Sequence, residues 1–184
     1  MDIQAQAGIL YQPIVSLVDG KIFGYEALSR ITDEKFLQNA TMMAPRKKFF
    51  LNVEPNAVHD EYKLNPSNVI FEVALKAIDH YKKQNFPIAI DDVGAVFLGL
   101  NIIASIKPNY IKIDMNLIKD IDDDEIKQLL CKAMVDFGKN HDIKLIAKGI
   151  ETEEELKTLV KLKVDYGQGY YLGIPQETFE DRLA

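Results

Sequence analysis

Cysteine is nearly absent from this chain. Of 184 residues only Cys131 is a cysteine, so an intrachain disulfide is excluded, and its place among helix-periodic apolar residues indicates a buried structural thiol. No apolar run approaches the length of a membrane span, and the N-terminus lacks the basic-then-apolar pattern of a signal peptide. There is also no repeat, low-complexity tract or linker. We therefore expect one domain, residues 1–184, located in the cytoplasm, alone or within a longer chain.

Histidine and net positive charge are also scarce. The three histidines, His59, His80 and His141, fall in connecting segments. A net charge of −6 argues against binding of a nucleic-acid polymer, although a local cluster of cations or metals can still bind a small anion. The content of 47% hydrophobic and 27% charged residues is typical of a globular protein with a sizeable core.

The stretch Pro87–Asp114 is the centre of the sequence pattern. An apolar run ends in two adjacent carboxylates, Asp91 and Asp92; a helix with apolar residues from Leu100 to Ile106 follows, and then an alternating strand containing Lys112. Strand, helix and strand make one βαβ unit, whose parallel strands end on the same edge of the sheet. The two acids repel each other, so we expect a lysine, a divalent metal or both beside them.

Similar strand-like runs continue on both sides of this unit. The others are Leu10–Val18, Ile22–Leu28 (joined to the first by a hairpin turn at Asp19-Gly20), Phe49–Val53, Val69–Val73, Lys144–Ala147 and Tyr166–Leu172. Helices are expected near Phe36–Met43, Ala57 and Leu75–Gln84, in a stripe from Ile126 to Phe137 begun by Asp122 or Asp123 and ended by Gly138, and after a Thr152–Glu155 capping box. Eight such strands predict an α/β fold, a (β/α)8 TIM-like barrel with an antiparallel first strand. Because such barrels usually need about 200 to 250 residues, the outer helices must be shortened or missing.

One polar residue stands near the end of each of seven strand-like runs, where a barrel of this kind builds its active site. These residues are Glu26, Asn52, Glu72, Asp91 with Asp92, Lys112, Lys148 and Gln168. Each alone is compatible with a solvated surface position, but seven in register indicate a site. Their hard oxygen atoms suit Mg²⁺, Mn²⁺ or Ca²⁺, and the set contains no histidine.

The strings around these residues resemble those of the EAL domain family of cyclic-di-GMP phosphodiesterases. They are YQPIV at Tyr11–Val15, GYEALSR around Glu26, NV at Asn52, FEV at Glu72, DDVG at Asp91, KID at Lys112, GIET at Gly149 and QGYYLGIP at Gln168. Each string is short, but all follow family order over nearly the whole chain. The resemblance implies hydrolysis of one phosphodiester of cyclic-di-GMP, with two metals activating water and stabilising the leaving oxygen.

The resemblance also implies a role for each matching residue. Glu26, Asn52, Glu72 and Asp91 would hold the first metal, with Asp91 bridging to a second ion that Asp92 helps to hold. The expected catalytic residues are Lys112, which would orient the water, Glu151 and Gln168. The expected ligand-binding residues are Gln12, Leu28, Arg30, Asp114, Tyr171 and Pro175, and the forked guanidinium of Arg30 suits a phosphate.

The chain departs from the family pattern most sharply at Lys148, where the family has a glutamate that ligates the second metal. The exchange changes the local charge by about two units, the charge of one divalent ion. We expect the ammonium of Lys148 to take the electrostatic place of that ion, pairing with Asp91, Asp92 or Glu151, so that at most one metal binds. The alternative is that the long side chain of Lys148 swings outward and water fills the gap.

Other departures lie nearby. Leu75 stands where the family usually has a glutamate, Val96–Gly99 replaces a small Gly/Ser-rich segment, and several dozen family residues are missing, mostly between Arg30 and Asn52 and between Glu72 and Asp91. Missing helices would expose barrel surface to a protein partner or to a second copy of the chain.

These departures favour a degenerate EAL domain, which binds cyclic-di-GMP in signalling with weak or no hydrolysis. Three alternatives stay open. The first is an active, metal-dependent phosphodiesterase that yields the linear dinucleotide, and the second is a protein-interaction module that no longer binds cyclic-di-GMP. The third is a Schiff-base enzyme that uses Lys148 with a pKa lowered by Lys112.

Overall fold

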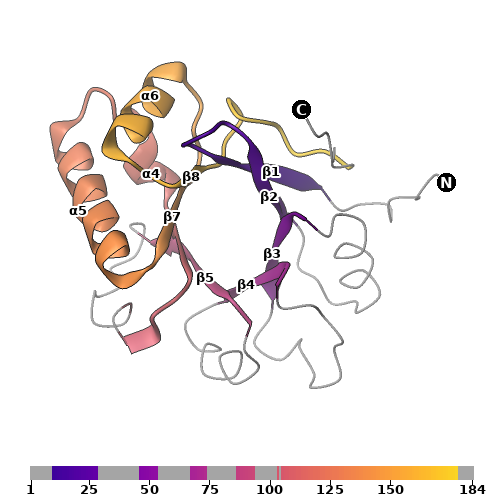
Figure 1. Ribbon diagram of the computed structural model, residues 1–184. Coiled ribbons are helices and arrows are strands. Elements are labelled where there is room, and N and C mark those ends of the chain that lie inside the picture. Colours follow the sequence, from indigo (N-terminus) through magenta and orange to yellow (C-terminus); the bar gives the residue numbers. More distant parts are fainter. Residues whose placement is uncertain are drawn as a thin grey trace.

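The computed structural model describes residues 10–28, 46–53, 67–73, 86–93, 103 and 105–177. Eight strands close into a barrel in sequence order (Figure 1). They are β1 (Tyr11–Ser16), β2 (Ile22–Ala27), β3 (Lys48–Val53), β4 (Val69–Val73), β5 (Ile88–Val93), β6 (Tyr110–Ile113), β7 (Lys144–Ala147) and β8 (Tyr166–Gly167). Strand β1 runs antiparallel to both β2 and β8, and the remaining neighbours are parallel. The predicted barrel with an antiparallel first strand is therefore confirmed.

Three described helices lie beside β7 and β8 (Figure 1). They are α4 (Met115–Ile118), α5 (Glu125–His141) and α6 (Glu153–Leu162), and none of the helices within the described ranges is long and apolar enough to cross a membrane. The helices predicted near Phe36–Met43, Ala57 and Leu75–Gln84 fall outside the described residues, as do Leu75 and Val96–Gly99. The barrel surface expected to be uncovered near these segments therefore stays a prediction.

Side chains alternate along each strand between the outer face of the barrel and its interior, and each face has its own apolar cluster. Outward-facing residues such as Phe49, Phe71, Ile111 and Leu145 pack in the larger apolar cluster, which includes helix residues such as Leu159. A second apolar cluster contains Ile14, Phe50, Ile70, Ala89 and Ile146, with Phe23, Tyr110 and Tyr166 against it. Most of these inner residues lie two positions from a polar strand-end residue, such as Tyr110 before Lys112, so they share its face of the strand. The apolar layer thus closes the barrel beneath the polar site.

Helix α5 differs from its predicted ends. Asp124, rather than Asp122 or Asp123, caps its N-terminus by accepting from the backbone N–H groups of Ile126 and Lys127. The helix also continues past Gly138 to Asp142, whose left-handed backbone (φ 57°) forms the C-cap. Gly138 is instead a packing position, since a Cβ there would lie 2.6 Å from the carbonyl oxygen of Ile143.

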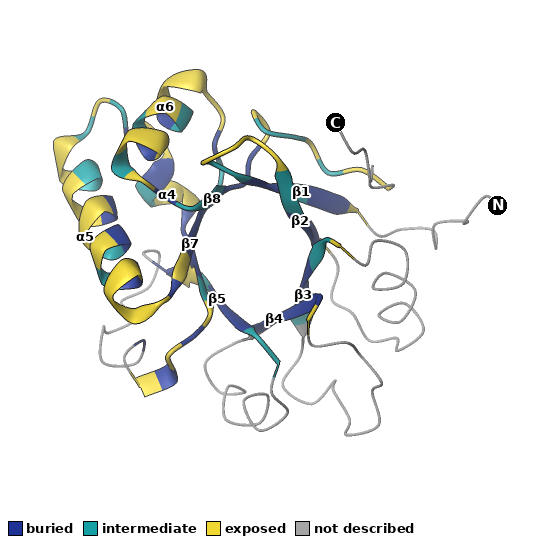
Figure 2. Ribbon diagram, in the orientation of Figure 1, coloured by how far each residue is buried: buried dark blue, intermediate teal, exposed yellow. Residues whose placement is uncertain are grey.

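The apolar stripe of α5 is only partly buried. Cys131 and Val135 are buried, as expected for the thiol, whereas Ile126 and Leu129 are 71% and 70% exposed. Figure 2 shows buried, intermediate and exposed residues along this helix. The periodicity predicted the helix correctly but did not identify which residues face the barrel.

Candidate active site

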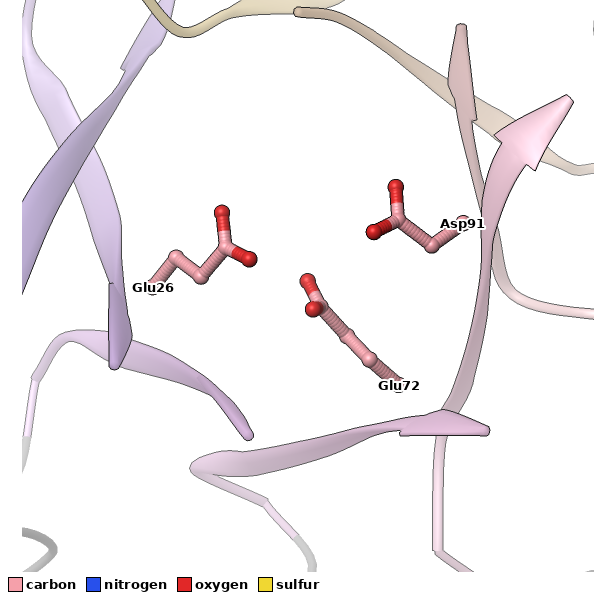
Figure 3. A group of neighbouring side chains, drawn as sticks. All are labelled: Glu26, Glu72 and Asp91. Atoms are coloured by element: carbon pink, nitrogen blue, oxygen red, sulfur yellow. The ribbon is translucent and has the colours of Figure 1, made fainter. Parts of the chain in front are cut away.

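Four strands bring a mostly buried charged cluster to the carboxyl ends of the barrel. Glu26 comes from β2, Glu72 from β4 and Asp91 from β5, and their carboxylates point toward one another (Figure 3). One oxygen from each lies within 4.8 Å of the others. Lys112 from β6 reaches the same cluster, so the polar residues predicted at these strand ends do converge.

Lys112 neutralises part of this acidic cluster. Its side chain is fully buried, and its Nζ lies 2.8 Å from Glu26 Oε2 and 2.6 Å from Glu72 Oε1. Burial lowers the pKa of the amine, but attraction to Glu72, Glu26 and Asp91 outweighs that effect, so the pKa is raised. The residue is therefore a permanent cation inside the barrel.

The two glutamates beside Lys112 have opposite pKa shifts. Burial raises the pKa of Glu26, but Lys112 and a hydrogen bond from Gln168 lower it to about 2. Burial is complete at Glu72, and together with repulsion by Glu26 and Asp91 it overrides Lys112 and raises the pKa to about 8. The Lys112 contact is shorter at Glu72, but Glu72 Oε2 is buried and has no hydrogen-bond partner among the described residues. The opposite shifts favour a proton on Glu72 rather than on Glu26.

Amide side chains hold Glu26 in place. Gln168 Nε2 donates to Glu26 Oε2 at 2.6 Å and to Gln12 Oε1 at 3.1 Å, while Asn52 Nδ2 lies 3.3 Å from Glu26 Oε1. Gln12 in turn donates to the carbonyl oxygen of Gly173 at 3.2 Å. Both oxygens of the Glu26 carboxylate therefore accept hydrogen bonds, which favours its ionised form.

Lys148 lies above the cluster, directly after β7. Its Nζ is 2.7 Å from Asp91 Oδ1 and 2.7 Å from Asp92 Oδ1, which contradicts the alternative in which the side chain swings outward. Burial and repulsion by Lys112 lower the pKa of Lys148, but hydrogen bonds to Asp91 and Asp92 raise it overall. An ammonium held in this way is not a nucleophile, so the Schiff-base alternative loses its basis.

Backbone geometry fixes both sides of this ion pair. The N–H of Lys148 donates to the carbonyl oxygen of Ile113 at 3.1 Å, and the next residue, Gly149, has a φ of 73°. A Cβ at Gly149 would lie 2.6 Å from the Cβ of Met115, so glycine is required there. Asp92 is also left-handed (φ 53°), and its N–H donates to Asp91 Oδ1 at 2.8 Å.

A pocket of about 320 Å³ opens beside these residues. It is lined by Gln12, Glu26, Leu28, Met115, Lys148, Gly149, Glu151, Gln168, Gly169 and Tyr170. The sequence predicts a site role for Gln12, Glu26, Leu28, Lys148, Glu151 and Gln168, but not for Met115, Gly149, Gly169 and Tyr170. Met115 directly follows Asp114, and Tyr170 lies two positions after Gln168. This closeness to predicted site residues was the sequence signal available for them.

Other predicted ligand-binding residues do not line this pocket. Asp114 is buried and caps α4, accepting from the backbone and side-chain N–H groups of Asn116. Tyr171 is exposed and Pro175 is half-buried, whereas Arg30 falls outside the described residues. The expected strand Tyr166–Leu172 ends at Gly167, and the chain turns at Gly169.

The sequence model of the EAL domain family matches residues 37–175. This chain belongs to the EAL domain family. The Glu26-Ala27-Leu28 tripeptide precedes the matched range. One curated relative and one solved structure, however, match 92% and 96% of the chain.

Relatives and solved structures agree with this assignment. The chain is 32% identical over 106 residues to the cyclic di-GMP phosphodiesterase PdeA of Borreliella burgdorferi, covering 58% of this chain and 16% of the relative. It is 24% identical to the probable cyclic di-GMP phosphodiesterase PdeB of Escherichia coli, covering 92% of this chain and 43% of the relative. The chain thus spans less than half the length of both.

A solved structure of similar extent is the standalone EAL protein of Vibrio cholerae in its c-di-GMP bound form, with 26% identity, a TM-score of 0.74, and coverage of 96% of this chain and 95% of that one. Klebsiella pneumoniae BlrP1, solved as a complex with manganese and cyclic-di-GMP, shares the fold with 22% identity and a TM-score of 0.76, over 95% of this chain and 58% of its own.

The EAL cluster of this chain fits one divalent cation. Glu26, Glu72 and Asp91 offer converging carboxylate oxygens, and Glu72 Oε2 is buried without a partner within the described part of the chain. Lys112 contacts Glu26 Oε2 and Glu72 Oε1 but leaves Glu72 Oε2 for an ion, whereas at the Asp91–Asp92 position Lys148 Nζ lies 2.7 Å from both carboxylates. An ammonium cannot ligate a metal, so Lys148 supplies no ligand at that position.

The shifted pKa of Glu72 predicts a pH-dependent stability. Because this pKa rises from 4.5 to about 8, the folded state binds a proton that the unfolded state has lost. Metal-free protein should therefore lose stability as pH rises from 4.5 to about 8, whereas the lowered pKa of Glu26 acts only below 4.5. In Glu72→Gln this loss should disappear, leaving the variant about 1–3 kcal/mol more stable than wild type at high pH.

Urea unfolding in EDTA at several pH values measures this difference. Glu154→Gln, which makes the same charge change at an exposed position in the first turn of α6, is the matched control and should run parallel to wild type. Parallel curves for Glu72→Gln and wild type would show that Glu72 carries no proton in the folded state.

Proposed function

We propose that this EAL domain binds cyclic-di-GMP as a regulatory module and hydrolyses it weakly or not at all. The observation that carries this proposal is the position of the Lys148 ammonium, 2.7 Å from both Asp91 and Asp92. The family pattern has a metal-ligating glutamate at this position. The lysine preserves charge balance beside the two acids but supplies no ligand for a second ion.

The remaining site is arranged to bind rather than to cleave. Glu26, Glu72 and Asp91 would hold one divalent cation, Mg²⁺ or Mn²⁺, which would neutralise charge in the acidic cluster beneath the pocket. Lys112 is fully enclosed and engaged by Glu26 and Glu72, so it stabilises the acidic cluster. The pocket above them is lined by polar and apolar side chains, including Leu28 and Tyr170, as a small-molecule site requires.

The second candidate is an active phosphodiesterase that works with one metal. Glu72 Oε2 favours it, because this buried atom has no hydrogen-bond partner in the described part of the chain and a bound cation would satisfy it. The two candidates make different predictions for turnover and similar predictions for binding.

Two measurements on the purified chain separate these functions. Chromatographic assay of cyclic-di-GMP hydrolysis in Mg²⁺ and in Mn²⁺ should give turnover no more than about tenfold above that of Asp91→Ala, since a metal-activated water is missing. Higher turnover would establish the enzyme. Calorimetric titration should show dinucleotide binding that Arg30→Ala weakens, and absence of binding would leave the protein-interaction module.

A further inference from the structure

The Lys148 ammonium has a hydrogen-bond donor to spare. A lysine ammonium carries three N–H donors. Two are directed to Asp91 Oδ1 and Asp92 Oδ1, and no other acceptor for Nζ is found among the residues that the structure describes. The side chain is 23% exposed and lines the pocket. The third N–H is therefore available to whatever occupies that pocket.

The pocket otherwise lacks positive charge. Its charged lining residues are Glu26, Glu151 and Lys148, so among the described residues Lys148 supplies its cation. The other lysine of the site, Lys112, is fully buried and committed to two glutamates. The carboxylates of Glu26 and Glu151 would repel a phosphodiester that enters the pocket. Among the described lining residues, the Lys148 ammonium is the charged group that would attract it.

We propose that Lys148 donates its third N–H to a phosphodiester of the ligand, so that the site binds a cyclic dinucleotide without a divalent ion at the Asp91–Asp92 position. This inference rests on the proposed function and names the group that recognises the phosphate. The two aspartates hold the ammonium in place before the ligand arrives, so little side-chain entropy is lost on binding. A charge-assisted hydrogen bond of this kind is stronger than a neutral one.

Titration of cyclic-di-GMP in EDTA and in Mg²⁺ tests the proposal. Wild-type affinity should differ by less than about threefold between the two conditions, and Lys148→Met should weaken binding in EDTA by at least about tenfold. The matched control is Lys144→Met, at the opposite end of the same strand, where the lysine pairs with Asp165 and is absent from the pocket lining. Binding that requires Mg²⁺, or that Lys148→Met leaves unchanged, overturns the proposal.

A double variant separates direct contact from charge balance. Lys148→Met combined with Asp92→Asn restores the net charge of the site but not the donor. Its affinity should stay at least about tenfold below wild type, because the hydrogen bond is still missing. Recovery to wild-type affinity would show that Lys148 only neutralises the aspartates, and the contact with phosphate would be refuted.

A second probe keeps this inference separate from the proposed function. Inorganic phosphate should broaden in phosphorus NMR on adding wild-type protein and Lys144→Met, but not on adding Lys148→Met. If phosphate behaves in this way while cyclic-di-GMP does not bind wild type, the proposed function fails and the anion site stands. If cyclic-di-GMP binds wild type and Lys148→Met equally, the proposed function stands and the anion site fails. If neither probe binds wild type, both fail.

Discussion

Replacing Lys148 with glutamate is expected to raise the number of bound divalent ions from one to two and to increase hydrolysis. The exchange removes an ammonium that lies 2.7 Å from Asp91 and from Asp92 and puts a carboxylate in its place. The local charge falls by about two units, so a position that repelled a second cation then attracts it. We expect Mn²⁺ affinity at the second position to rise at least about a hundredfold, because a carboxylate that can ligate the metal replaces an ammonium that repels it.

Calorimetry with Mn²⁺ measures the stoichiometry, and the hydrolysis assay measures its consequence. Lys148→Gln separates the two parts of the change, since it removes the positive charge without adding a ligand, and it should bind the second ion weakly. Lys144→Glu makes the same charge change at the other end of β7 and should leave stoichiometry unchanged. A single bound ion in Lys148→Glu would mean that another departure, such as Leu75 or Val96–Gly99, already disables the second position.

The strand ends were the part of this site that the sequence could predict. A strand places alternate residues on the same face, so Glu72 and Lys112 had to point the same way as the apolar residues two positions earlier, Ile70 and Tyr110. Parallel pairing then brings such ends together whatever the connecting segments do. The resemblance put Lys148 in the place of a metal-ligating glutamate, and the charge of the adjacent acids then favoured its pairing with Asp91, Asp92 or Glu151; the structure has the pairs with Asp91 and Asp92.

The rest depended on features that sequence periodicity does not encode. Asp114 could serve the ligand or cap a helix, and one turn of helix, α4, is too short to produce a periodic signal. Three consecutive aspartates precede α5, and only the path of the chain decides that Asp124 is the cap. Pocket residues such as Met115 and Tyr170 carry no titratable group suited to this chemistry, so nothing in their type marks them.

Replacing Lys112 with methionine is expected to cause the largest loss of stability. Methionine has a similar length but no charge, so Glu26 and Glu72 would stay buried without the ammonium that lies 2.8 Å and 2.6 Å from them. Breaking a buried ion pair by removing one partner costs about 3–5 kcal/mol, because the remaining charge is uncompensated. The effect should be read from urea unfolding of metal-free protein at pH 5 and pH 8.

The pH dependence of this loss tests its cause. Without Lys112 the pKa values of both buried glutamates rise, so each takes up a proton in the folded state at pH values where the unfolded chain is ionised. The destabilisation should therefore be larger at pH 8 than at pH 5. Added Mg²⁺ should reduce it, because a divalent cation can neutralise the same two carboxylates. Lys144→Met, which breaks an exposed pair with Asp165, should cost less than about 1 kcal/mol at either pH. A loss in Lys112→Met that is equally small, or that neither pH nor Mg²⁺ changes, would show that Lys112 fills space in the barrel rather than balancing its charge.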